Sequence, residues 1–463
     1  MKAPSLFLAL IGLCLLAGCT GVPTRSEQEA RRDLREVQQA FRPLDKVPLP
    51  LVTTNSTLNE LLSFAMLNQP KVAAAYFDWA ASVERITTAR SFPDPQLTFQ
   101  MDIQNIVTSI MPGLMGSIPW PSRLRAGAEV ASAESRAKYF NFQSAVLESA
   151  FAVKRAYYQL SFLAEKIRVN QETLGLVADL EKLARAQNEV GKVTLQDVLR
   201  AQIEQDRLRN DMANLEDSRH ALLAQFKAAL GLKAEDTTPP MPARFESTPL
   251  DLTGERLFET ALAQNTRLKA MEAEVRAAEA SILLARRARR PDFSLGLMAD
   301  AQMSPTLYRP LGTISLPLWR DKIAAQIAEA QANQRGAEAR LSAEQIELAA
   351  AFAERSFLYR EATRNLTLLN DRLLPKARES LEVARSGYLA GQIDFLNLTD
   401  SERTLLGFEL DKVESATQRE IILAELSLII QGMPPVNAPM NSNAVRMNRG
   451  TPSSTRKTNP GGM

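Results

Sequence analysis

Ser117-Ile118-Pro119-Trp120 begins a long segment that the chain contains twice, and its counterpart Ser315-Leu316-Pro317-Leu318 follows 198 positions later. Each tetrapeptide precedes a long helical pattern that ends at a glycine, Gly191 in the first copy and Gly391 in the second. Another helical pattern follows each glycine. A nearly constant offset with matched prolines and glycines indicates an internal repeat. Each repeat is predicted to fold as a helix, two short strands, a long helix, a tight turn and a final helix.

Short segments with strand character precede each long helix. In residues 96–104, apolar and polar side chains alternate without exception, which is typical of a strand with one dry face and one wet face. Residues 293–299 repeat the pattern more weakly, and the return strands are expected to carry Ile118 and Trp120 in the first repeat and Ile314, Leu316 and Leu318 in the second. The connections, at about 106–113 and 302–310, contain proline or glycine and are predicted as turns.

The four strands of one chain are too few to close a barrel, although their apolar faces need to be covered. Two isolated hairpins have unpaired edges, and unpaired backbone groups cannot face hydrocarbon. A closed barrel can bury such faces in lipid, and three chains together supply enough strands to close one. The sequence therefore predicts a homotrimer with a small transmembrane β-barrel of twelve strands.

The helical segments are too long for an ordinary globular core. Residues 122–189 span 68 positions, or about 100 Å of α-helix. Segments 57–90 and 194–230 fit end to end beside it, and the second repeat matches this with 255–290 and 394–430 beside 321–389. Apolar residues at heptad spacing predict coiled-coil pairs. The predicted fold class is thus mainly α, a long coiled-coil helical barrel joined to the four strands of each chain.

Two residues interrupt the long helices at equivalent places. Gly175 and Pro375 each lie 16 residues before the glycine that ends their helix, about 24 Å from that end. Glycine loosens a helix and proline bends it. We expect a hinge there, at which the cylinder tapers and flexes; a tolerated irregularity without a role is the alternative.

The N-terminus resembles a secretory signal that ends in a bacterial lipobox. Lys2 precedes an apolar run, and Leu16-Ala17-Gly18-Cys19 follows it. On this interpretation Cys19 becomes the lipidated first residue, whereas cleavage near Ala17 is the alternative. After the signal, no apolar run reaches the roughly 18 residues of a membrane-spanning helix. Residues 19–56 are expected to form a tether that is partly helical over 27–41.

Composition argues against several classes of function. The net charge of +2 gives no strong attraction to nucleic acid. His220 is the one histidine of the chain, and no phosphate-binding loop or Cys/His cluster is present. We therefore expect no enzyme activity, no cofactor and no metal site.

These features together resemble the TolC-like outer-membrane efflux family over residues 57–433. The most specific motifs are 191–202 and 386–391, at the two glycine turns that end the long helices, which we call the tips. In that family a tyrosine usually stands three residues before the tip glycine; Tyr388 fits this pattern and Asn188 departs from it. The resemblance implies a trimer in the Gram-negative outer membrane that extends into the periplasm. It also implies docking to an inner-membrane pump through a periplasmic adaptor. Residues 118–125 further resemble the joint of the heavy-metal efflux branch, so metal cations join drugs as possible cargo.

Candidate functional residues lie at the tips. The glycine turns carry apolar side chains where water is expected, so we predict that they contact the adaptor: Val190, Gly191, Lys192, Val193, Ala390, Gly391, Gln392 and Ile393. Thr194 and Asp394 are expected to cap the returning helices. The family resemblance places a carboxylate ring six and nine residues after the second glycine, where Asn397 and Asp400 stand. Asp197 holds the equivalent place in the first repeat. A solvated helix face is the alternative to this pore constriction.

The expected organisation has five parts: a signal peptide at 1–18, a lipid-anchored tether at 19–56, the first repeat at 57–251, the second repeat at 252–433 and a disordered tail at 434–463. Four arginines, Arg286, Arg287, Arg289 and Arg290, close to a predicted membrane strand, suit a helix C-terminus and phosphate headgroups. The function predicted is a passive export channel. A coiled-coil envelope lipoprotein without a conduit is the alternative, but it leaves the paired hairpins without a purpose.

Overall fold

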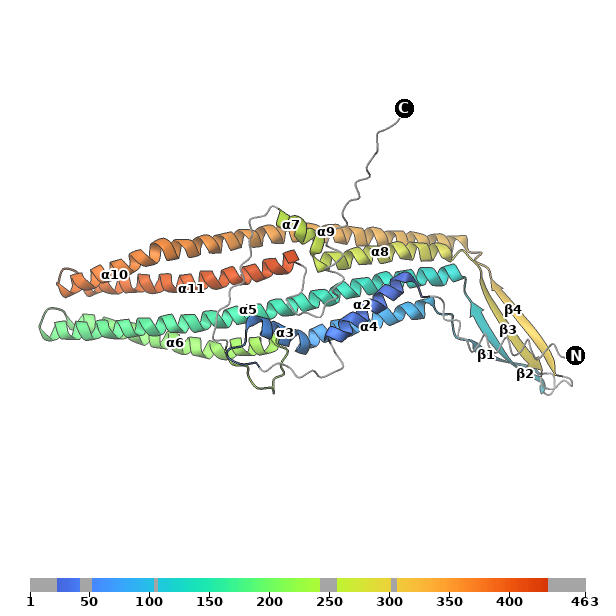
Figure 1. Cartoon of the computed structure of the whole chain (residues 1–463), viewed down its shortest axis with the longest axis horizontal. Helices are drawn as coiled ribbons and strands as arrows, with labels where there is room; N and C mark the ends of the chain where they lie inside the picture. Colours follow the sequence, from blue (N-terminus) through green and yellow to red (C-terminus); the bar gives the residue numbers. More distant parts are fainter. Residues whose placement is uncertain (1–22, 42–51, 104–106, 242–255, 301–305, 432–463) are drawn as a thin grey trace, which may run out of the picture.

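The structure is a computed structural model that describes residues 23–41, 52–103, 107–241, 256–300 and 306–431. The molecule is elongated, with a small β-sheet at one end and two helical hairpins that end at the other (Figure 1). In these described residues no helix is both long and apolar enough to cross a membrane. Cys19 and the predicted tail lie outside the described residues.

The helices of the first repeat are α3 (Leu58–Asn68), α4 (Pro70–Arg90), α5 (Pro121–Glu189) and α6 (Leu195–Ala229). The 69 residues of α5 span about 100 Å, and α3, α4 and α6 pack along it as predicted. The capping box at the start of α3 is complete, since the side chains of Thr57 and Glu60 each accept the other's backbone N–H. A single helix was expected over 57–90, but α3 ends before Pro70. Proline has no N–H to donate to the preceding turn, so the helix restarts there.

The second repeat contains α7 (Arg256–Gln264), α8 (Thr266–Arg287), α9 (Arg320–Leu368), the π-helix η1 (Leu369–Leu373), α10 (Leu374–Leu389) and α11 (Phe395–Gln431). An unbroken helix over 321–389 was expected, but η1 interrupts it just before Pro375. The proline ring collides with the carbonyl four residues earlier and leaves it without an N–H partner, which favours a locally widened turn. Asn265 separates α7 from α8, where one helix was also expected, and its Oδ1 caps α8.

The four strands form one antiparallel sheet in the order β1 (Gln96–Ile103), β2 (Val107–Ile118), β3 (Asp292–Asp300) and β4 (Leu307–Ser315). Pairing of β2 with β3 joins the two hairpins within the chain, which the sequence did not predict. Within the described residues, the outer edges of β1 and β4 have no strand partner.

The second strand of each hairpin, β2 or β4, begins and ends earlier in the sequence than predicted. Pro112 and Gly113 lie inside β2 instead of in a turn. A Cβ on Gly113 would stand 2.6 Å from Cγ of Met298 on β3, so close strand approach requires glycine there. Pro310 lies inside β4, an edge strand, where a missing N–H is tolerated. Trp120 is the N-cap of α5, and Leu316 and Leu318 follow β4, so none of the three lies in a strand.

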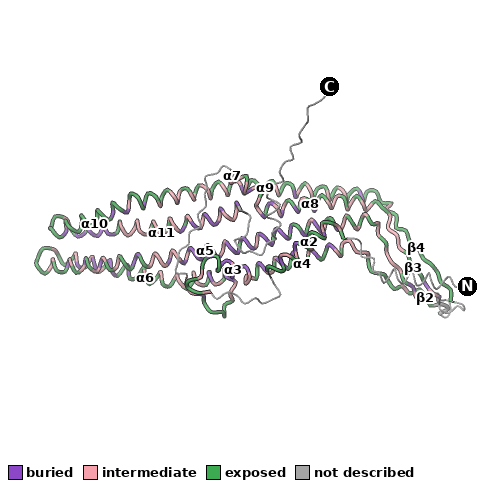
Figure 2. Tube along the Cα trace, viewed as in Figure 1, coloured by how far each residue is buried: buried purple, intermediate pink, exposed green. Residues whose placement is uncertain are grey.

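The sheet has two chemically different faces. Register places Ile118 beside Phe293 and Phe293 beside Ile314, and the alternation of each strand extends this row into a face without a charged residue. Its members with described side chains are Leu97, Phe99, Met101, Ile110, Pro112, Leu114, Gly116, Ile118, Phe293, Leu295, Leu297, Ala299, Tyr308, Pro310, Gly312 and Ile314. We call this set the apolar face. Much of it is exposed (Figure 2), for example Phe99 at 66% and Leu295 at 60%.

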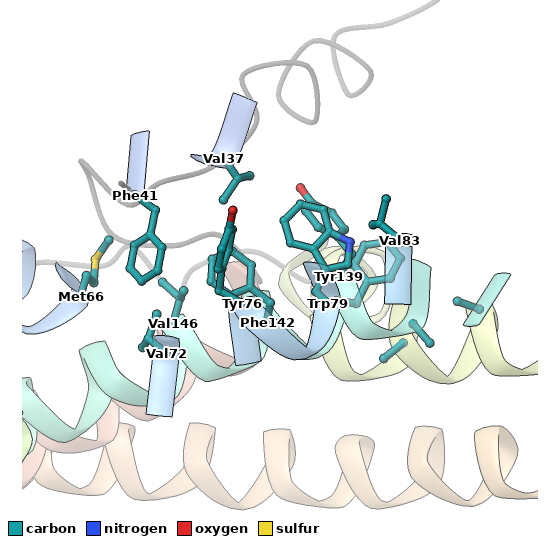
Figure 3. Close-up of a cluster of buried hydrophobic side chains, with 14 residues drawn as sticks. Val37, Phe41, Met66, Val72, Tyr76, Trp79, Val83, Tyr139, Phe142 and Val146 are labelled. Atoms are coloured by element: carbon teal, nitrogen blue, oxygen red, sulfur yellow. The ribbon is translucent and has the colours of Figure 1, made fainter. Parts of the chain in front are cut away.

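The largest core cluster lies where α4 and α5 meet (Figure 3). Trp79 stacks on Phe142 with ring centroids 5.8 Å apart, and Tyr76 meets Phe142 edge-on at 5.9 Å. Aromatic pairs of this kind add about 0.5–1.5 kcal/mol each beyond the burial of their area.

Helix α2 (Arg25–Phe41) attaches the N-terminal segment to this core. The partial helix expected in the tether is present, and it is part of the body, since Val37 and Phe41 are buried in the cluster. Glu27 is fully buried, and one of its carboxylate oxygens accepts a hydrogen bond from Nε of Arg90 at 2.6 Å.

Candidate functional site

The two helical hairpins turn at glycines with left-handed backbones, as predicted. Gly191 has φ of 70° and Gly391 has φ of 71°. The N–H of Lys192 donates to the carbonyl of Gln187 at 2.9 Å, and that of Gln392 donates to the carbonyl of Gly387 at 2.8 Å. This is the Schellman arrangement, in which glycine avoids the steric penalty that a Cβ brings at positive φ.

The predicted tip residues divide into two groups by exposure. Val190 is 66% exposed, and Gly191, Lys192, Ala390, Gly391 and Gln392 are also exposed. Val193 and Ile393, by contrast, are half-buried and pack against the core beneath the turns. A surface offered to a partner therefore rests on Val190 more than on the other two apolar side chains.

The two tips are closed by different side chains. Nδ2 of Asn188 donates to the carbonyl of Val193 at 2.8 Å and so ties the end of α5 to the start of α6. Tyr388, at the equivalent place in the second repeat, is buried, and its ring packs on that of Phe395 with centroids 5.6 Å apart. The departure from tyrosine at Asn188 thus replaces a ring contact with a hydrogen bond.

A single cluster joins both hairpins beneath the tips. We define this tip cluster by its buried members, Leu180, Ala184, Val198, Ala201, Leu381, Ala384, Tyr388, Phe395 and Leu398. They come from α5, α6, α10 and α11. Burial raises the pKa of the Tyr388 hydroxyl to about 12, and the negative charge of Asp197 adds to the shift. The tips of one chain are therefore a packed unit.

The residues predicted to constrict a pore lie on two helices. Asn397 and Asp400 are exposed on α11, whereas Asp197 is half-buried on α6 and lies 3.8 Å from Nη1 of Arg200. No hydrogen bond or ion pair joins these three in the part of the chain that the structure describes. Asp394 caps α11 by accepting the N–H of Asn397 at 3.0 Å. Thr194 was expected to cap α6 in the same way, but its side chain makes no capping hydrogen bond.

A buried carboxyl that the sequence analysis missed lies two turns above the second tip. Glu402 is 1% exposed between the apolar layers of Leu398 and Leu405, and neither of its carboxylate oxygens has a hydrogen-bond partner in the described structure. Its basic neighbour Arg403 pairs instead with Glu204 of α6. Burial and, to a smaller extent, the charge of Glu204 together raise the pKa of Glu402 to about 7, against the opposing effect of Arg403. A glutamate at a core position of the heptad pattern was the signal available in the sequence.

The proposed hinge positions differ in their surroundings. Gly175 lies within the uninterrupted helix α5, and a Cβ there would meet no atom within 4 Å. Pro375 is the second residue of α10, which begins directly after η1. The described structure thus contains a helix irregularity at one of the two predicted positions. Within the same residues, no group of His, Cys, Asp and Glu is placed to hold a metal ion.

Comparison with known proteins gives the following matches. The sequence matches the family model described as outer membrane efflux protein over residues 61–232 and 257–431, which follow the two repeats. No curated protein sequence matches the chain. Among solved structures, CusC aligns with a TM-score of 0.72 at 17% identity, covering 85% of this chain and 96% of that one.

Two further solved structures are similar. The outer-membrane channel OprN aligns with a TM-score of 0.70 at 18% identity, covering 81% of this chain and 90% of that one. The MtrE outer membrane channel of Neisseria gonorrhoeae, solved in its open state, aligns with a TM-score of 0.67 at 15% identity, covering 84% of this chain and 94% of that one. At these identities the similarity establishes the fold. It is mainly α with four strands per chain, as predicted from the sequence, and the strands form one antiparallel sheet.

Proposed function

This chain belongs to the outer membrane efflux protein family, and from that premise we propose that three copies of it form the outer-membrane duct of a tripartite efflux system. The family consists of passive channels, not enzymes. Three sheets joined edge to edge, β4 of one chain to β1 of the next, would make a closed barrel of twelve strands. The helices would continue the conduit through the periplasm.

The observation that supports this proposal most strongly is the apolar face of the sheet. It is uncharged and exposed in the single chain, and the outer edges of β1 and β4 beside it have no strand partner among the described residues. Exposed apolar strands with free edges invite aggregation in water. Closure in a membrane satisfies the edges and covers the face with lipid.

A pair of substitutions on neighbouring residues of β3 tests this. Leu295→Arg puts a charge on the apolar face, where a basic residue near the membrane midplane costs about 2–4 kcal/mol. Ser294→Arg puts the same charge on the opposite face. We expect the first variant to be lost from the outer-membrane fraction and the second to be retained. Equal retention of both would mean that the apolar face does not meet lipid.

We further propose that the tips dock a periplasmic adaptor and that an inner-membrane pump selects the cargo. Val190 offers an exposed apolar side chain at the first tip. Val190→Asp should abolish export while the trimer still assembles, and it avoids the half-buried Val193 and Ile393, where a charge would also disturb the tip cluster. Retained export would remove the tips from the docking surface.

Asp400 is proposed as the constriction, together with Asn397 and Asp197 as its neighbours. Three symmetry-related carboxylates would concentrate negative potential at the mouth and favour cations. Asp400→Ala should therefore lower the cation selectivity of single channels and raise their conductance. If selectivity is unchanged, the constriction lies elsewhere.

Two finer proposals come from the sequence. Lipidation of Cys19 would anchor the chain in the outer membrane, and a Cys19→Ser variant that lacks the mass of the lipid would support it; an unchanged mass would count against it. Heavy-metal cations are a candidate cargo because residues 118–125 resemble that branch of the family. If cells that lack this protein lose tolerance to heavy metals but keep tolerance to drugs, this cargo is favoured. The reverse result would exclude it.

A further inference from the structure

The helices meet the sheet at a junction where aromatic and basic side chains are stacked in order. Phe293 lies on the apolar face, between Ile118 and Ile314. The ring of Trp120 lies 5.9 Å from that of Phe293, and Cζ of Arg290 lies 5.3 Å from the centroid of the Trp120 ring. Arg290 therefore stands at the border of the apolar face, on the same side of the sheet.

Further positive charge gathers at this border. Helix α8 ends at Arg287, and its last turn continues as the N–H of Arg290 donates to the carbonyl of Arg287 at 3.0 Å. Arg289 and Arg290 lie two and three residues beyond the end of α8, close in sequence to Arg286 in its last turn. Arg286, Arg289 and Arg290 are all exposed. We call these three residues the junction arginines.

Among the residues that the structure describes, no carboxylate lies within 4 Å of a junction arginine to form an ion pair with it. In the described part of the chain, the ion pair near them is that of Arg123 with Asp292, at 2.5 Å between Nη1 and Oδ2, and it involves none of the three. Many other arginines of the chain pair with a glutamate or aspartate within 4 Å, as Arg90 does with Glu27. The ring of Trp120 offers no hydrogen-bond acceptor in its plane, so the N–H donors of Arg290 are left without a partner there.

The second repeat provides apolar side chains at the same junction. Beyond the end of β4, Leu318 is 72% exposed and Trp319 is 77% exposed, and Arg320 follows them. Tryptophan concentrates at the interface between hydrocarbon and headgroups because its ring is apolar and its N–H is polar. Exposure of a leucine and a tryptophan side by side indicates a surface that is covered in the assembled protein.

We propose that the junction arginines bind the phosphate groups of anionic phospholipids in the periplasmic leaflet of the outer membrane. This inference rests on the proposed function, because it requires the apolar face to lie in lipid. Guanidinium groups match phosphate oxygens with pairs of parallel N–H donors. The apolar face then meets the acyl chains, Trp120 and Trp319 lie at the boundary, and the junction arginines meet the phosphates. This order fixes the depth of the barrel in the membrane.

The dipole of α8 offers a simpler reason for positive charge at this place, since cations are favoured at a helix C-terminus. It accounts for Arg286, which lies in the last turn. It does not account for the exposed Trp319 or for the contact between Arg290 and Trp120.

The test compares two triple variants of the purified, full-length trimer in nanodiscs of phosphatidylcholine. The first is Arg286→Gln/Arg289→Gln/Arg290→Gln. The matched control is Arg335→Gln/Arg340→Gln/Arg364→Gln, which removes three exposed arginines of α9 that also lack an ion pair in the described structure. Native mass spectrometry measures the affinity of each for added phosphatidylglycerol.

A basic residue near an anionic membrane surface contributes about 1 kcal/mol, which corresponds to roughly a fivefold change in affinity. We expect the affinity for phosphatidylglycerol to fall by about that factor per junction arginine, and the control to match the wild type. An unchanged affinity in the first variant, or an equal fall in both, would overturn the proposal. Displacement of phosphatidylglycerol by millimolar inorganic phosphate would also overturn it, because the site would then be one for free anions.

The outcome separates this inference from the proposed function. If the wild-type trimer conducts ions, and the triple variant of the junction arginines binds phosphatidylglycerol as tightly as the wild type does, the inference alone is overturned. A wild-type protein that neither enters nanodiscs nor conducts would overturn the duct itself.

Discussion

Replacing Glu402 with glutamine is expected to stabilise the second tip at pH 8 and to leave it unchanged at pH 4. Glutamine has the shape of the protonated acid but cannot ionise. The carboxyl is 1% exposed and lacks a hydrogen-bond partner among the described residues, and burial raises its pKa from 4.5 to about 7. The packed state therefore disfavours the charged form.

The direction with pH follows from that shift. An acid whose pKa is raised by folding brings no penalty below the pKa of the open state, here 4.5, because both states are then protonated. The penalty grows between pH 4.5 and 7 and is complete above pH 7. A difference from 4.5 to about 7 corresponds to about 3–4 kcal/mol, or an opening equilibrium that changes by roughly 300-fold.

Hydrogen–deuterium exchange of residues 395–405 in the trimer measures this opening locally. After correction for the intrinsic rate at each pH, Glu402→Gln should slow exchange by up to roughly 300-fold at pH 8 and by little at pH 4. Glu382→Gln is the control, because that carboxyl is exposed on α10. If Glu402→Gln has the same effect at both pH values, or none at pH 8, the buried charge is not what limits the packing of the tip.

Three further predictions concern stability and opening. Glu27→Gln leaves Arg90 without its buried carboxylate and should cost about 3–5 kcal/mol, seen as faster proteolysis of α2; unchanged proteolysis would refute this. Gly191→Ala should cost about 1–2 kcal/mol through its φ of 70° alone, whereas Gly231→Ala should lower the melting temperature more, because its Cβ would also lie 2.8 Å from a backbone oxygen; equal losses would contradict the structure. Pro375→Ala should change the closed-state leak of single channels by allowing η1 to return to α-helix, and an unaltered leak would argue against a hinge.

The features that the sequence predicted correctly are those set by local pattern. Alternation in residues 96–104 predicted β1 because strand side chains alternate between faces whatever the strand packs against. The repeat of Gly191 and Gly391 predicted both tips because positive φ excludes most other residues. The absence of a proline over residues 122–189 and the heptad pattern there predicted the one unbroken helix α5.

The features that the sequence did not predict depend on what the chain packs against. Pro112 and Pro310 were interpreted as turn residues, yet strand neighbours hold both in extended backbone. Val193 and Ile393 were expected in water, but the two hairpins meet beneath them and half-bury both. The burial of Glu402 was not predicted, because the carboxyl loses water only when the neighbouring helices pack around it.

The central claim is that three chains close one ion-conducting duct. The most direct test measures the mass of the purified protein in detergent together with its single-channel conductance in a planar bilayer. The account predicts the mass of a trimer and a small, cation-selective conductance. A monomer or dimer without conductance would contradict it, because the apolar face and the free edges of β1 and β4 would then have no barrel to form.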